Sequence, residues 1–100
     1  MSKKTITFQA NFKAGAGEII FTGIDGLPAG ATLICDAAAP VTPQSFTANQ
    51  STGPQGIIVG GAAAPGATIT LNVLDGTKQL ATKDFKGPFA GVNISYVVAP

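Results

Sequence analysis

Histidine, arginine and tryptophan are absent from this 100-residue chain, and cysteine occurs once. Histidine is the usual general base and the commonest metal ligand, so its absence removes most acid–base and metal chemistry. Arginine is the preferred bidentate reader of phosphate and guanine, and here all six basic residues are lysines. We therefore expect no nucleic-acid partner. A single cysteine, Cys35, also excludes an intramolecular disulfide.

Charged residues of both signs are scarce. They make up 11% of the chain and leave a net charge of +1, whereas typical soluble domains contain roughly 25% charged residues. A surface with so few charges has little electrostatic protection against association. The composition fits two kinds of protein equally well: an ordinary small β-protein with a neutral surface, or a subunit that works packed against its neighbours.

Long hydrophobic runs are missing as well. No stretch approaches the ~20 apolar residues of a transmembrane helix, so we expect no membrane partner. Residues 1–12, MSKKTITFQANF, contain two lysines but not the apolar run of a secretory signal. We expect synthesis in a host cytoplasm. The length predicts one domain over residues 1–100, with residues 1–4 as a flexible N-terminal tail.

What the chain does contain is a regular β-pattern. Glycine and proline interrupt it about every 8 to 12 residues, which is typical of an all-β sandwich or barrel. Between these breaks, apolar and polar residues alternate with period two, and no segment has a helical period. The expected strands are residues 4–13, 18–24, 31–36, 45–49, 56–61, 67–76, 78–85 and 92–100. Seven to eight strands are the number of a Greek-key β-sandwich.

The turn in GLPAGAT, residues 26–32, has a counterpart in residues 64–68. In both, proline fixes φ, glycine permits a positive φ, and Ala-Thr then opens an apolar strand. A phosphate-binding loop would instead lead into a helix and carry a lysine followed by serine or threonine. The turn is therefore predicted to be architectural.

These same motifs resemble a known family. GLPAGAT, together with APGATITLNV at residues 64–73 and the polar hairpin after it, resembles bacterial and phage immunoglobulin-like domains over roughly residues 19–85. The resemblance implies an immunoglobulin-like Greek-key β-sandwich. It also implies a binding role without catalysis, as in the decoration and accessory modules of phage particles, and it transfers no site residues.

Few residues could support chemistry. The carboxylates are Glu18, Asp25, Asp36, Asp75 and Asp84. Asp25 and Asp75 each precede a glycine, as turn aspartates do, and no calcium-loop spacing is present. We expect no catalytic residue, no metal and no cofactor. Alternation puts Cys35 on the face of Leu33, so we predict that it is a small buried hydrophobe.

Partner contacts are predicted at two places. Phe89 lies beside Pro88 in the expected loop of residues 86–91. An aromatic residue there is more often tucked against the end of the sandwich, and less often anchors a partner. The first and last strands are expected at sheet edges, where unpaired backbone can accept another chain. Lys3 and Lys4 would blunt such an edge only weakly. With Pro88 and Phe89 they are the residues that we expect to contact a partner.

Together these observations predict a non-enzymatic structural protein of a viral particle, and specifically of a bacteriophage. It would decorate or stabilise the capsid or tail, and its partners would be a major capsid or tail protein and copies of itself. Its final location would be the virion. The alternative is a carbohydrate- or cell-surface-binding adhesion module. An exposed aromatic platform would favour adhesion, and a flat patch rich in alanine and threonine would favour assembly.

Overall fold

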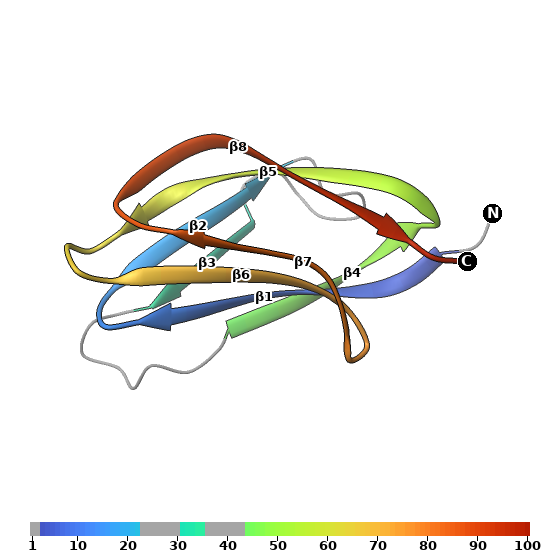
Figure 1. Ribbon diagram of the computed structural model, residues 1–100, viewed down its shortest axis with the longest axis horizontal. Helices are drawn as coiled ribbons and strands as arrows, with labels where there is room; N and C mark the ends of the chain where they lie inside the picture. Colours follow the sequence, from blue (N-terminus) through green and yellow to red (C-terminus); the bar gives the residue numbers. More distant parts are fainter. Residues whose placement is uncertain (1–2, 23–30, 36–43) are drawn as a thin grey trace.

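The computed structural model describes residues 3–22, 31–35 and 44–100, and the side chains of 3–22 and 44–100. Over these ranges the chain forms eight strands and no helix (Figure 1). The strands are β1 (Lys3–Lys13), β2 (Gly17–Thr22), β3 (Ala31–Cys35), β4 (Gln44–Ser51), β5 (Gly53–Ala63), β6 (Thr68–Asp75), β7 (Lys78–Phe85) and β8 (Pro88–Val98).

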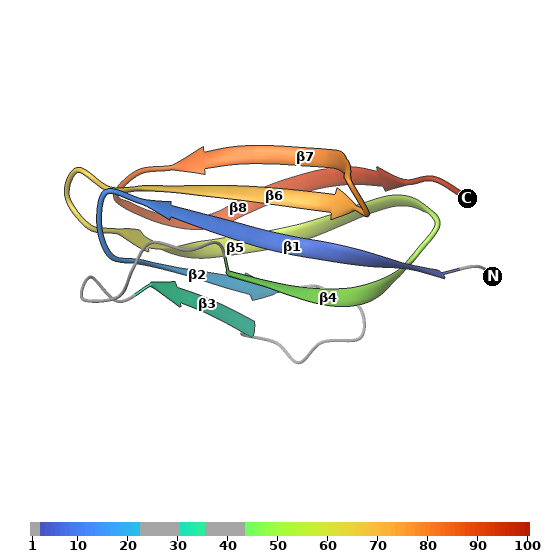
Figure 2. The same cartoon turned by 90° about the horizontal axis from the view of Figure 1, so that it is seen from below.

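The strands form two antiparallel four-stranded sheets that pack as a sandwich (Figure 2). Sheet A has the order β4-β1-β6-β7, and sheet B has the order β3-β2-β5-β8. Only β2–β3 and β6–β7 are consecutive strands that pair; every other connection passes from one sheet to the other. The prediction of an all-β sandwich with about eight strands is confirmed at this level.

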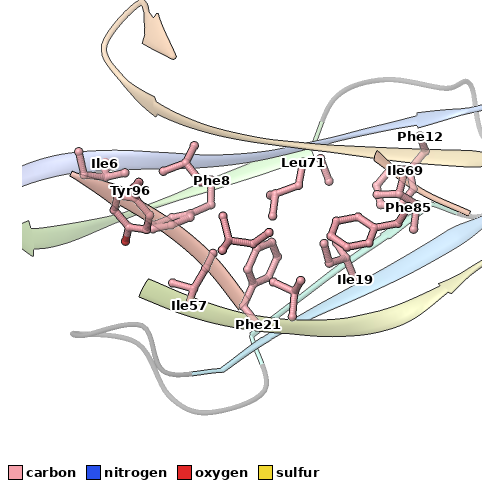
Figure 3. Close-up of a cluster of buried hydrophobic side chains, with 14 of the residues drawn as sticks. Ile6, Phe8, Phe12, Ile19, Phe21, Ile57, Ile69, Leu71, Phe85 and Tyr96 are labelled. Atoms are coloured by element: carbon pink, nitrogen blue, oxygen red, sulfur yellow. The ribbon is translucent and has the colours of Figure 1, made fainter. Parts of the chain in front are cut away.

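The core lies between the two sheets because each strand alternates buried and outward residues. In β6, Ile69, Leu71 and Val73 are buried, as their spacing predicts. Phe8 of β1 and Phe21 of β2 project from opposite sheets and meet edge to face, with ring centroids 6.2 Å apart. Figure 3 shows the apolar side chains of both sheets filling the space between them. This packing leaves the outer face of each sheet for other roles.

The conformations of two turns follow from the residue types at their central positions. Between β5 and β6, the Ala67 amide donates to the Ala64 carbonyl oxygen at 2.8 Å, and Gly66 has φ 82°. Proline and then a positive-φ glycine at the two central positions make this a type II turn. Between β6 and β7, Gly76 has φ 61°, and the expected hairpin forms. The related turn at residues 26–30 lies outside the described residues.

Two predicted loops are largely strand. Residues 50–56 were expected to be a loop, but β4 continues to Ser51 and β5 begins at Gly53. Pro54 is tolerated because, in the described residues, β2 pairs with β5 only from Ile58 onward. A proline nitrogen directed to that unpaired side removes no ladder hydrogen bond, and on its other side Pro54 pairs with Val97 of β8. Similarly, residues 86–91 were expected to be a loop, but β8 already begins at Pro88.

Candidate interaction surfaces

Phe89 packs within its own domain. Its ring stacks on Phe85 with centroids 4.1 Å apart and planes at 17°, and it is half-buried against the core. Of the two roles left open by the sequence, this geometry matches the tucked one. Pro88, the first residue of β8, is exposed and pairs with Ala62. Pro88 therefore remains available to a partner, whereas Phe89 contributes to packing.

Lys3 and Lys4 belong to β1 rather than to a flexible tail. They pair with Ser51 and Gln50 of β4. The Lys4 Nζ lies 3.1 Å from Asp75 Oδ2, with the two side chains 37% and 23% exposed. Such a surface ion pair contributes about 0.2–1 kcal/mol. It joins the start of β1 to the end of β6.

The expectation that both terminal strands lie at sheet edges is half wrong. β8 is an edge strand of sheet B, but β1 is central in sheet A, between β4 and β6. Its backbone is paired on both sides from Thr7 to Ala10, whereas, among the described strands, Lys3–Ile6 pair only with β4. The four predicted contact residues are also not brought together: the lysines lie at the end of the sandwich near Val98, and Pro88 begins β8 at the other end (Figure 1).

The outer face of sheet A is polar and mostly uncharged. Its central outward side chains are Thr5, Thr7, Gln9, Asn11, Ser45, Thr47, Asn49, Thr68, Thr70, Asn72 and Thr82, and the same face also carries the half-buried Leu74 and the charged Asp84. Neighbouring strands are linked by side-chain hydrogen bonds across this face. Thr5 Oγ1 donates to Asn49 Oδ1 at 3.0 Å, and Thr82 Oγ1 donates to Asn72 Oδ1 at 2.8 Å. We call this surface the polar face.

The outer face of sheet B is built mostly from small and apolar residues. From β2, β5 and β8 its outward residues are Glu18, Ile20, Thr22, Pro54, Gly56, Ile58, Gly60, Ala62, Asn93, Ser95 and Val97. Among the described side chains, Ile58 and Val97 are the large hydrophobic ones that are exposed, at 44% and 61%. Both lie on this surface, which we call the apolar face.

Sequence reasoning missed the apolar face, although a signal was present. Apolar residues run without interruption through Ile57, Ile58 and Val59. Because successive side chains in a strand point to opposite faces, such a run must place one large apolar residue outward. Tyr96, Val97 and Val98 form a second run of this kind.

The described residues contain no cluster of three or more histidine, cysteine, aspartate or glutamate side chains that could hold a metal. Asp75 is engaged by Lys4, and Asp84 accepts a hydrogen bond from Thr70 Oγ1 at 2.7 Å. Asp25 and Asp36 lie outside the described residues. So does the Cys35 side chain, although the Cys35 backbone in β3 pairs with Gly17. No helix in the described part of the chain is long and apolar enough to span a membrane.

No family model, curated protein or solved structure significantly matches this chain. The resemblance to bacterial and phage immunoglobulin-like domains therefore stays a prediction from the sequence motifs.

Proposed function

We propose that this chain is a non-enzymatic structural protein of a bacteriophage particle, which decorates or stabilises the capsid or tail through protein–protein contacts. The observation that carries the proposal is the chemistry of its two outer faces. Both are sheet surfaces of short, mostly uncharged side chains, one rich in threonine and the other in small and apolar residues. Protein interfaces are likewise depleted in charged residues at their centres.

The positions of the aromatic residues favour assembly over glycan binding. The chain contains six phenylalanines and one tyrosine. Phe46 and Phe89 are half-buried against the core, and the other five aromatic residues are buried. A carbohydrate-binding module would be expected to expose an aromatic platform. The threonine-rich polar face is the feature that favours an assembly role.

An immunoglobulin-like Greek-key topology is part of the same proposal, and the strand order supports the Greek-key component. After the β2–β3 hairpin the chain crosses to sheet A, where β4 pairs with β1; after the β6–β7 hairpin it crosses to sheet B, where β8 pairs with β5. In both sets of four the last strand returns beside the first, as in a Greek key, although here the second and third strands lie in the other sheet. Because β1 pairs with β4 and β6 rather than with β2, the immunoglobulin likeness lies in the sandwich architecture, not in the constant-domain strand order.

The proposal is tested by adding the purified protein to phage particles that lack it and sedimenting the mixture. We expect saturable co-sedimentation with a fixed number of copies per particle. Charge-introducing variants of each face, Thr47→Lys and Ile58→Lys, identify the contacting face, and Pro88→Glu and Lys3→Glu test the two ends of the sandwich. If the wild-type chain stays in the supernatant and instead binds a soluble glycan as a monomer, the adhesion alternative replaces the proposal.

A further inference from the structure

The edge strands of the two sheets are protected very unequally. Exposed edges carry unpaired N–H and C=O groups, and natural proteins shield them with charged residues, proline, bulges or short strands. β7, an edge of sheet A, carries Lys78, Lys83 and Asp84. β8, an edge of sheet B, is 11 residues long, contains no charged residue, and has proline only at its first position.

The other two edge strands are less suited to pairing with a partner. In the described part of the chain β3 spans 5 residues, and short edge strands are poor templates for pairing. β4 lacks charge, but its outward side chains belong to the polar face, and Asn49 is hydrogen-bonded to the neighbouring Thr5. The large exposed hydrophobic residues of the described chain lie instead on sheet B, on β8 itself and on the adjacent β5. β8 is therefore the edge at which pairing would also cover apolar surface.

A bulge shortens the segment of β8 whose backbone could pair with another strand. Val59 pairs with Val92 and Gly61 with Phe89, so that Ala90 and Gly91 together stand opposite Gly60. Gly91 has φ 62°. Bulges bend a strand and interrupt pairing at an edge. The regular, unshielded segment is consequently Val92–Val98.

Within this segment the two faces alternate cleanly. Ile94, Tyr96 and Val98 are buried, whereas Asn93, Ser95 and Val97 are exposed. Ile58 of β5 pairs with Asn93, so its exposed side chain lies one strand in from the edge. An added strand would thus meet an uncharged edge bordered by apolar side chains.

We propose that Val92–Val98 pairs antiparallel with the same segment of a second copy of this chain, about a two-fold axis at Ser95. This inference rests on the proposed function, because particle proteins of this kind work in repeated copies. Sheet B would then continue across both molecules. In this register Ser95 faces Ser95 of the second copy, and Val97 faces Asn93, so one surface is self-complementary, as a two-fold interface requires.

The size of this contact predicts a weak dimer in solution. At about 3.3 Å per residue the segment spans roughly 23 Å. Multiplied by the 25 Å extent of the molecule along which the two sheets stack (Figure 1), this length gives at most roughly 575 Å² per copy. The total of at most about 1,150 Å² stays below the ~1,200 Å² of stable complexes. Pairing would therefore become strong only where a particle holds copies side by side at high effective concentration.

Sedimentation velocity over a concentration series tests the pairing directly. We expect the wild-type chain to form dimers within a concentration series from roughly 10 μM to 1 mM, the range of weak association. Val97→Lys should raise the dissociation constant roughly several-fold to tenfold, because it replaces two symmetry-related Val97–Asn93 cross-strand contacts and puts a lysine on the edge strand, which disfavours edge-to-edge pairing. Thr82→Lys, a charge added to the already charged β7 edge, should change it little. A wild-type chain that is monomeric at about 1 mM, or equal effects of both variants, would overturn the proposal.

The register is tested by cross-linking in a Cys35→Ala background. Directly opposite residues of an antiparallel pair have Cα atoms about 4.5–5.5 Å apart, which suits a disulfide. Ser95→Cys should give a covalent dimer under mild oxidation, at least about tenfold faster than the matched control Thr82→Cys. Equal rates would contradict the β8 pairing. If particles contain the chain but Ser95→Cys does not cross-link, only the pairing fails; if dimers form but particles lack the chain, only the proposed function fails.

Discussion

Replacing Phe8 with alanine should remove the side chain that joins most of the aromatic core. Phe8 has no exposed surface. Its ring stacks on Phe46 at 5.4 Å and meets Phe21 and Tyr96 edge to face, both at 6.2 Å. These partners come from β4, β2 and β8, so the cavity would lie between the two sheets. Phe→Ala substitutions in cores lower the free energy of unfolding by about 3–5 kcal/mol. Because Phe8→Ala also removes three aromatic contacts, we expect it to lower this free energy by about 4 kcal/mol.

A loss of this size is a large part of the roughly 5–15 kcal/mol by which domains are stable. At about 4–8 °C per kcal/mol for a domain of this length, the melting temperature should fall by roughly 15–30 °C. Urea denaturation followed by far-ultraviolet circular dichroism measures the free energy of unfolding. The matched control is Thr7→Ala, the adjacent residue on the polar face, which should cost no more than about 0.5 kcal/mol. Comparable losses in the two variants would refute the assignment of the faces of β1.

Three further substitutions can be measured in the same denaturation assay. Gly61→Ala should lower the free energy of unfolding by at least about 2 kcal/mol. Gly61 has φ 149°, and its added Cβ would collide with the Glu18 carbonyl oxygen of β2. A near-neutral result would mean that β2 and β5 are not in this register. Gly66→Ala should cost only about 1 kcal/mol, since φ is 82° but no atom lies within 4 Å of the added Cβ; a loss as large as that of Gly61→Ala would contradict the open type II turn. Tyr96→Phe should cost about 1–2 kcal/mol because it removes the hydroxyl that donates to Gln50 Oε1 at 3.1 Å in the interior, and an unchanged midpoint would show that this bond does not stabilise the fold.

The strands and the core were predictable because both depend on local alternation. The inward positions of β6 follow directly from apolar residues at every second place, and the same holds for the buried residues of β8 from Ile94 to Val98. The hairpin at Asp75–Gly76 was predictable from its turn chemistry. These features need no knowledge of which strands are neighbours.

Strand order was not predictable, because pairing partners far apart in the sequence leave no local pattern. β1 was therefore expected at an edge, although it lies between β4 and β6. Without the strand order, the surroundings of the candidate contact residues could not be predicted either. Lys4 was assigned to a flexible tail, yet it reaches Asp75 across the sheet, and Phe89 was assigned to a loop, yet it stacks on Phe85. Only the register between strands determines which of these side chains a partner could reach.

The central claim is that this chain works as a structural component of a particle, and quantitative mass spectrometry of purified virions tests it most directly. Particles from the host that carries the gene should contain the chain in a fixed ratio to the major capsid or tail protein. The ratio should persist after washing in about 1 M salt, since high salt screens contacts between charges and these faces have few. Absence of the chain from purified particles, with all of it recovered as free protein, would contradict the account.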